Sequence, residues 1–69
     1  MTEKEFRRLV SQALIDNPTW RYGQALYNTA SELLPVARVA AGTPIDPFHN
    51  DLRGEFFIQW LRDIGAFDA

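Results

Sequence analysis

The stretch TPIDPFHND, residues 43–51, holds several side chains that could do chemistry. His49 is the only histidine of the chain, and Asp46 and Asp51 lie close to it on either side. A histidine between two carboxylates could take part in acid–base catalysis or bind a metal ion. However, these spacings match no common metal-ligand pattern, and no catalytic Ser/His/Asp or Cys/His set can be assembled from this short stretch. We therefore predict no catalytic, metal or cofactor site. We interpret the stretch as a loop in which the Asp46 side chain caps a single helical turn that extends to His49.

A second group of polar side chains lies in RYGQALYN, residues 21–28. Arg21, Gln24 and Asn28 are spaced three and four apart, so a helix places them on one side. They either face water or are covered by the 43–51 loop, where they would bind its carbonyl groups and the Asp46 carboxylate. In the second case they hold the loop in place, and in the first they form a candidate binding surface.

That candidate surface would bind a protein partner. Arg21 would supply charge-assisted hydrogen bonds, and Phe48 an apolar anchor. The amide side chains of Gln24 and Asn28 would add paired hydrogen-bond donors and acceptors. The residues of the predicted surface are Arg21, Gln24, Asn28, Asp46, Phe48 and His49.

The elements that must position these residues are helices. Apolar residues recur at intervals of three and four, which is typical of amphipathic helices, and no stretch alternates as a half-buried strand does. We predict one all-α domain over residues 1–69, a small bundle of three longer helices and one short helix. The longer helices are expected over about 3–16, 20–34 and 51–64, and the short one over about 35–41.

The ends and buried faces of these helices can also be predicted. Thr2 and Glu5 form a capping-box pair for the first helix, and Thr19 is a candidate cap for the second. Gly23 and Ala30 lie at the centre of the second helix's apolar face, where small residues let another helix approach. In the short helix and the last helix, we expect these apolar side chains to be largely buried: Val36, Val39, Ala40, Leu52 and Phe56. Ile15 and Ile58 fall off the apolar arcs of their helices and are expected to be exposed.

Composition excludes several classes of protein. The chain has no cysteine, so disulfides and thiolate metal sites are excluded. Seven basic and nine acidic residues give a net charge of −2, which argues against general nucleic-acid affinity. No apolar run approaches the roughly 20 residues of a membrane span, and the first residues, MTEKEF, do not resemble a signal peptide. We expect a soluble, cytoplasmic protein that is not an enzyme.

Two alternatives remain open. TASELLPVARVAAG has the outline of a helix-turn-helix, and a DNA-binding regulator is one alternative, but its second helix offers only Arg38 to DNA. The more basic surface lies on the first helix, at Lys4, Arg7 and Arg8. The other alternative is a structural or self-assembling protein, whose homodimer interface would contain the side chains Ile15, Ile58 or Phe67.

Two short elements resemble a family of small, uncharacterised bacterial and bacteriophage proteins. Their R-x-G-Q-x-x-x-N pattern matches residues 21–28, and their G-T-x-x-D-P-F pattern matches residues 42–48. The resemblance implies a phage or prophage origin and no established activity. It favours a protein-interaction module that binds a host or viral protein in the host cytoplasm.

Overall fold

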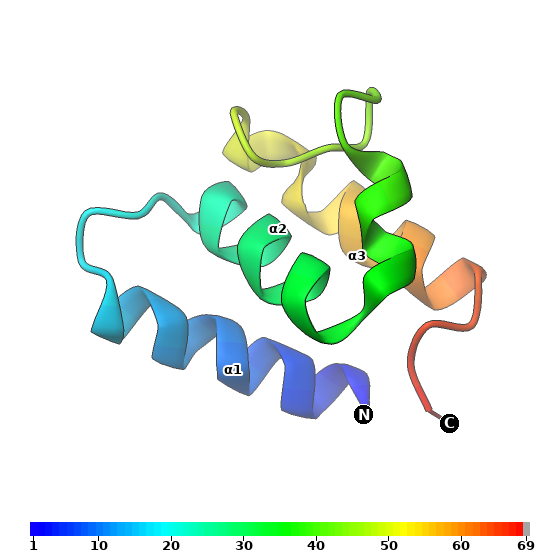
Figure 1. The fold of residues 1–69 in the computed structure, drawn as a ribbon, viewed down its shortest axis with the longest axis horizontal. Coiled ribbons are helices and arrows are strands. Elements are labelled where there is room, and N and C mark those ends of the chain that lie inside the picture. Colours follow the sequence, from blue (N-terminus) through cyan, green and yellow to red (C-terminus); the bar gives the residue numbers. More distant parts are fainter. Residues whose placement is uncertain (69) are drawn as a thin grey trace.

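The computed structural model describes residues 1–68 and consists of helices joined by turns (Figure 1). The all-α prediction is confirmed, with three longer helices and a compact arrangement. The Cα radius of gyration is 10.8 Å, close to the roughly 11 Å expected of a compact chain of this length. Residue 69, the last of the predicted domain, lies outside the described residues. The elements are α1 (Glu3–Asp16), α2 (Tyr22–Leu33), η1 (Pro35–Ala40), η2 (Asp51–Arg53) and α3 (Gly54–Asp63), where η denotes a 3₁₀ helix.

Helices α1 and α2 form a hairpin whose first helix begins and ends as the sequence indicates. The Glu5 amide donates to Thr2 Oγ1 over 3.1 Å, and the Thr2 amide donates to Glu5 Oε1 over 3.0 Å. The second helix begins later than predicted, at Tyr22 instead of residue 20, and Thr19 does not cap it. The Trp20 amide donates to the Asn17 carbonyl over 2.9 Å, so a turn occupies the positions assigned to the helix start.

The short helix η1 is a 3₁₀ helix, and this corrects the prediction of which side chains it buries. Val36 and Val39 are 46% and 70% exposed, whereas Ala37 and Ala40 are buried. In a 3₁₀ helix, residues three apart lie directly above one another. Ala37 and Ala40 therefore share the inner face, and the two valines share an outer face. The prediction rested on the high apolar content of this stretch, which does not show which side of the helix faces the core.

The predicted last helix is divided into η2 and α3, and its buried face also differs from the prediction. Ile58 is buried, while Leu52 and Phe56 are 85% and 70% exposed. The buried stripe begins at Gly54, because a Cβ there would lie 2.8 Å from Leu26 Cδ1. The small size of Gly54 lets α3 approach α2 closely, with Ile58 on the inner side and Leu52 and Phe56 on the outer side.

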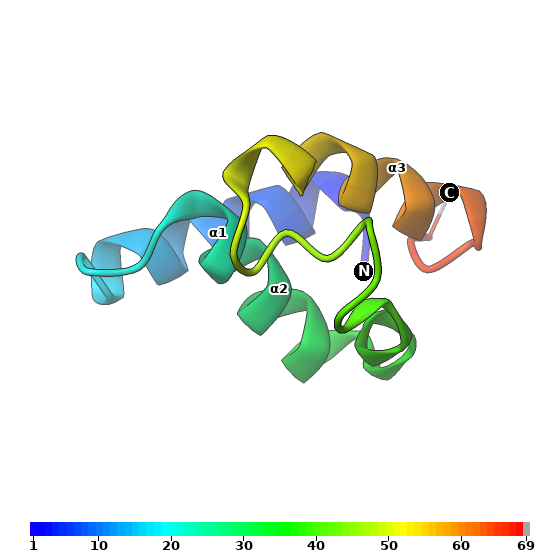
Figure 2. The same ribbon diagram turned by 90° about the horizontal axis from the view of Figure 1, so that it is seen from above.

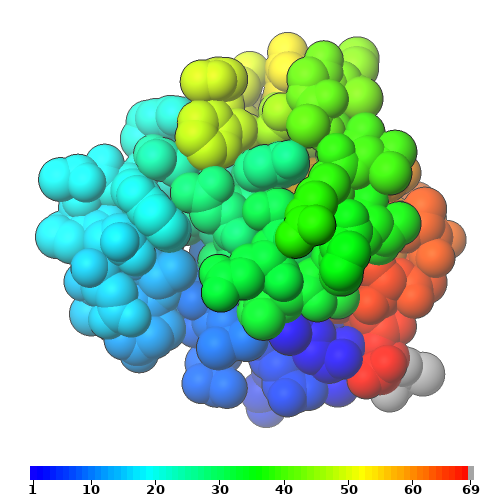
Figure 3. Space-filling view, in the orientation of Figure 1, coloured from blue at the N-terminus to red at the C-terminus, as the bar shows by residue number. Residues whose placement is uncertain are grey.

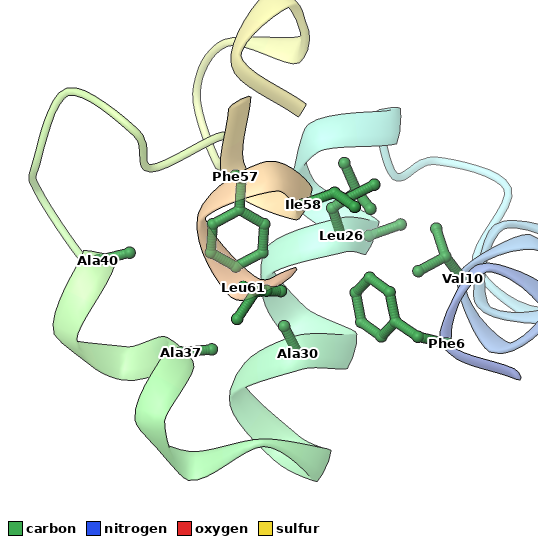
Figure 4. Close-up of a cluster of buried hydrophobic side chains, with 10 residues drawn as sticks. Phe6, Val10, Leu26, Ala30, Ala37, Ala40, Phe57, Ile58 and Leu61 are labelled. Carbon is green, nitrogen blue, oxygen red and sulfur yellow. The ribbon is translucent and has the colours of Figure 1, made fainter. Parts of the chain in front are cut away.

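The core lies between the three longer helices and η1 (Figure 4). Phe57 and Leu61 of α3 lie between the alanines of η1 and the apolar face of α2, while α1 contributes Phe6 from the other side. Near the C-terminus, the Phe67 ring packs against Phe6 with ring centroids 5.4 Å apart. The buried apolar residues are Phe6, Val10, Ala25, Leu26, Ala30, Ala37, Ala40, Phe57, Ile58 and Leu61.

The two ends of the described chain lie together (Figure 1). The Met1 amino group forms an ion pair with Asp68 Oδ2 at 2.9 Å, and the Asp68 amide donates to the Met1 carbonyl over 2.9 Å. Among residues 1–68, no helix has the length and apolar character needed to cross a membrane.

Candidate functional site

Arg21 binds the loop that follows η1, which is one of the two alternatives that its spacing left open. Its Nη2 donates to the Phe48 carbonyl over 2.6 Å, and its Nη1 lies 3.3 Å from Asp51 Oδ1. The same carboxylate oxygen accepts the Gly23 amide over 2.9 Å, at the free first turn of α2. Asp51 thus joins the loop to the start of α2. Figure 3 shows the yellow surface of the loop beside the cyan-green surface of the segment that leads into α2.

The loop also explains Gly23. A Cβ at this position would overlap the Pro47 carbonyl oxygen and lie 2.9 Å from Asp51 Oδ1. Gly23 therefore permits the close approach of the loop backbone, and the predicted role in helix packing belongs to Gly54 instead. A glycine in the first turn of α2 lets the Pro47 backbone lie directly on the helix.

Asp46 acts within its own loop and forms no hydrogen bond or ion pair with Arg21. Its Oδ2 accepts the Gly42 amide over 2.8 Å, and its Oδ1 accepts the Phe48 amide over 2.9 Å. The predicted capping role is therefore present, but residues 47–49 form a turn and not a helical turn. Gly42 has a φ of 74°, a conformation that glycine adopts without a steric penalty.

Phe48 is a packing residue as much as a surface residue. Its ring is half-buried and meets Tyr27 edge-on, with centroids 5.9 Å apart. On its other side lies the exposed His49 ring, at 4.8 Å. Among residues 1–68, no three His, Cys, Asp or Glu side chains are grouped so that they could hold a metal ion.

Gln24 and Asn28 are half-buried, and Asn28 does not lie with the loop. Its side chain lines a separate groove between α1 and α2. The structure thus divides the predicted surface. Arg21, Asp46 and Phe48 belong to the loop and its attachment, His49 is exposed beside them, and Asn28 belongs to the groove.

The groove has a volume of about 320 Å³ and combines an apolar lining with polar groups from both helices. The indole of Trp20, which lies in the turn between the helices, forms part of the lining. Sequence reasoning missed this site because residue 20 was placed inside the second helix, expected over about 20–34, and not in the turn before it. The lining residues are Leu9, Gln12, Ala13, Asp16, Asn17, Trp20, Asn28, Thr29, Glu32 and Leu33.

The charges of the groove are negative and lie where the helices disfavour them. Asp16 is in the last turn of α1 and Glu32 in the last turn of α2, and neither last turn contains a basic residue. The C-terminal end of a helix carries a partial negative charge, which repels a carboxylate. Asp16 Oδ1 accepts a hydrogen bond from the Gln12 side chain at 2.9 Å, and neither carboxylate takes part in an ion pair within residues 1–68.

The cations of the first helix are partly engaged elsewhere. Arg7 binds Glu3 at 3.1 Å and Glu55 of α3 at 2.9 Å, and Arg62 of α3 binds Glu3 at 2.8 Å. These arginines hold the pKa of Glu3 and of Glu55 below the ordinary value. Burial raises the pKa of Tyr22, whose hydroxyl donates to Glu55 over 3.0 Å. This network joins α1 to α3 and leaves Lys4 and Arg8 as the cations of α1 outside it.

The helix-turn-helix outline does not lead to a recognition helix. Its second element is the six-residue 3₁₀ helix η1, and the Arg38 Nε donates to the Ser31 carbonyl over 2.9 Å. The exposed side chains beside Arg38 are the apolar Val36 and Val39, which offer no hydrogen bond to a base edge.

Comparisons with known proteins found no matching family model, no matching curated protein and no matching solved structure.

Proposed function

We propose that the protein is a non-enzymatic interaction module that binds another protein through the groove between α1 and α2. The observation that carries this proposal is the apolar groove with two carboxylates that lack an ion-pair partner within the described residues. Its volume of about 320 Å³ lies at the lower end of the range of ligand sites. A groove of this size can hold one or two side chains of a partner.

The chemistry of the groove favours a basic segment of that partner. A Lys or Arg side chain has an apolar stem that can lie against Leu9 and Trp20, and a charged head that can reach Asp16 or Glu32. The Trp20 indole is also a favourable contact for a cation. A positive charge here would relieve the repulsion between each carboxylate and its helix terminus.

In this proposal Arg21 has a structural role and does not bind the partner. Its contacts with Phe48 and Asp51 support a role in fixing the loop against α2. The resemblance in residues 21–28 and 42–48 directs the search for a partner to bacterial and phage proteins. We propose that binding takes place in the cytoplasm of the host.

A direct test uses a short synthetic peptide that contains both lysine and leucine, titrated into ¹⁵N-labelled protein and followed by NMR. The largest shifts are expected at backbone amides of residues 9–20 and 28–33. Asp16→Asn and Glu32→Gln should each weaken binding by about five- to tenfold, because each removes one charge contact.

Asp68→Asn is the matched control, since it removes one negative charge, paired with the Met1 amino group, from a residue that does not line the groove, and it should leave peptide affinity within about twofold. Unchanged affinity in both groove variants would remove the groove as the binding site. Affinity capture from a bacterial lysate with wild-type protein and with Asp16→Asn would then identify natural partners whose binding depends on this charge.

A further inference from the structure

The outward side of η2 and α3 carries a row of large apolar side chains. Leu52 is 85% exposed, Phe56 is 70% exposed and Ile64 is 43% exposed, while Trp60 is half-buried. Figure 2 shows α3 along the edge of the molecule, with no other element on its outer side. We call Leu52, Phe56, Trp60 and Ile64 the outer ridge.

The spacing of the outer ridge is the spacing by which helices pack. Residues four apart form a ridge on a helix surface, and two helices pack when the ridges of one fit between those of the other. The outer ridge runs from η2 through α3 to the residue after it, thirteen residues, or about 18 Å at a rise of about 1.5 Å per residue. An apolar ridge of this length without a covering element is typical of a surface that binds another helix.

The sequence around the ridge is complementary to itself when two copies run antiparallel. If a two-fold axis passes near residue 58, Leu52 lies opposite Ile64, and Phe56 opposite Trp60. The same axis places Arg53 opposite Asp63, so that opposite charges meet. A parallel arrangement would instead place Arg53 opposite Arg53 and Asp63 opposite Asp63, which repel each other.

These two charges are available for such a contact. Arg53 forms no ion pair within residues 1–68. The Asp63 Oδ1 accepts a hydrogen bond from the neutral Gln59 side chain at 2.8 Å and has no cationic partner in the same range. The other charged residues of α3, Glu55 and Arg62, bind α1 and lie on the flank away from Arg53.

We propose that the protein forms a two-fold symmetric dimer in which the outer ridges of two copies pack antiparallel, with Arg53 of each copy against Asp63 of the other. The interface contains none of the groove residues, so the dimer goes beyond the proposed function and does not depend on it. The side chains predicted earlier for self-association do not provide this interface, because Ile58 is buried, Phe67 packs on Phe6, and the exposed Ile15 lies on α1, outside the outer ridge.

Sedimentation equilibrium from about 1 µM to 1 mM protein tests the dimer. Wild-type protein should shift from monomer to dimer within this range, and Phe56→Glu should remain monomeric throughout. Because Phe56 is exposed, the variant should keep the helical circular dichroism of the wild type. Ile15→Glu is the matched control, since Ile15 is 72% exposed on α1 and should not affect dimerisation.

Reversing the charges of Arg53 and Asp63 tests whether the two copies pack antiparallel. Arg53→Asp and Asp63→Arg should each weaken the dimer about tenfold, because each creates two like-charge contacts across the two-fold axis. The double variant Arg53→Asp/Asp63→Arg should restore wild-type affinity. A wild-type protein that stays monomeric, or a double variant weaker than both single variants, would overturn the proposal.

These measurements test the groove and the dimer separately. Phe56→Glu should bind the lysine- and leucine-containing peptide as wild type does, and Asp16→Asn should dimerise as wild type does. Loss of peptide binding in Phe56→Glu would show that the dimer and the groove are linked.

Discussion

The α1–α2 hairpin and the segment from residue 42 to 53 satisfy their backbone hydrogen bonds in different ways. Within α1, amides and carbonyls pair along the helix, and one capping box completes its start. In the later segment, the carboxylates of Asp46 and Asp51 and the guanidinium of Arg21 bind backbone groups that no regular element would satisfy. The hairpin depends on periodic packing, whereas the loop depends on a few individual side chains.

This difference determines where single substitutions should act. A change on the exposed side of α1 removes little, because neighbouring turns repeat the same bonds. At the loop, the side chains of Asp46, Asp51 and Arg21 each bind backbone groups that have no other hydrogen-bond partner nearby to replace them. Variants at the junction of the two regions therefore provide the strongest tests.

Gly23→Ala should have the largest effect. In an ordinary helix interior the change would stabilise the fold by about 1 kcal/mol. Here the new Cβ would overlap the Pro47 carbonyl, so we expect the free energy of unfolding to fall by about 2 kcal/mol. Urea denaturation measures this, with the exposed Ser11→Ala of α1 as a control that should change stability by less than about 0.5 kcal/mol. A stabilised Gly23→Ala variant would contradict the contact between loop and helix.

Arg21→Ala should have a smaller and more local effect. It removes the bonds to the Phe48 carbonyl and to Asp51, and for a half-exposed side chain we expect a loss of about 1 kcal/mol. Hydrogen exchange should accelerate at the amides of Phe48 and Asn50 more than at those of α1. Arg8→Ala, on the exposed side of α1, is the control. Equal changes in the loop and in α1 would mean that the two regions open together.

Lowering the pH should have the smallest effect on the free energy of unfolding. It weakens the ion pairs that join α1 to α3. The pKa values of Glu3 and Glu55 are lower in the folded protein than their ordinary value of 4.5. Such groups stabilise the fold above the unfolded pKa, and this contribution is lost as pH falls through the folded pKa. Stability should decline below about pH 4.5, by less than about 1 kcal/mol for each exposed pair. Thermal unfolding from pH 7 to pH 3 checks this, and Glu55→Gln should show a smaller decline than wild type.

The helices of the hairpin could be predicted from sequence because a 3.6-residue period and a capping box are local signals. The bounds of α1 match the prediction, and α2 differs by two residues at its start and one at its end. The error at its start arises from a turn closed by Trp20, which competes with the predicted cap at Thr19.

The later half could be predicted less well because its burial depends on contacts between distant residues. For η1, a high apolar content predicted burial of Val36 and Val39, but the side that faces the core is that of the two alanines, Ala37 and Ala40. For α3, the deciding residue was Gly54, whose small size lets α3 approach α2 closely, with Leu52 and Phe56 on the outer side. The groove depends on Trp20 lying in a turn, which no periodic pattern indicates. Arg21 was recognised as a residue that could bind carbonyl groups of the loop, and it binds the Phe48 carbonyl, but the carboxylate that it meets is Asp51 and not Asp46.

The meeting of Met1 and Asp68 offers a way to engineer the protein. Residues 1 and 68 already lie side by side, so a short glycine linker could close the described chain into a ring, in which the Met1 amino group becomes an uncharged amide while the backbone hydrogen bond from the Asp68 amide remains. A cyclic chain has fewer conformations when unfolded, and ring closure should therefore raise the melting temperature. Neither the groove nor the outer ridge contains Met1 or Asp68, so a cyclic form would carry both proposed binding surfaces on a more heat-resistant scaffold.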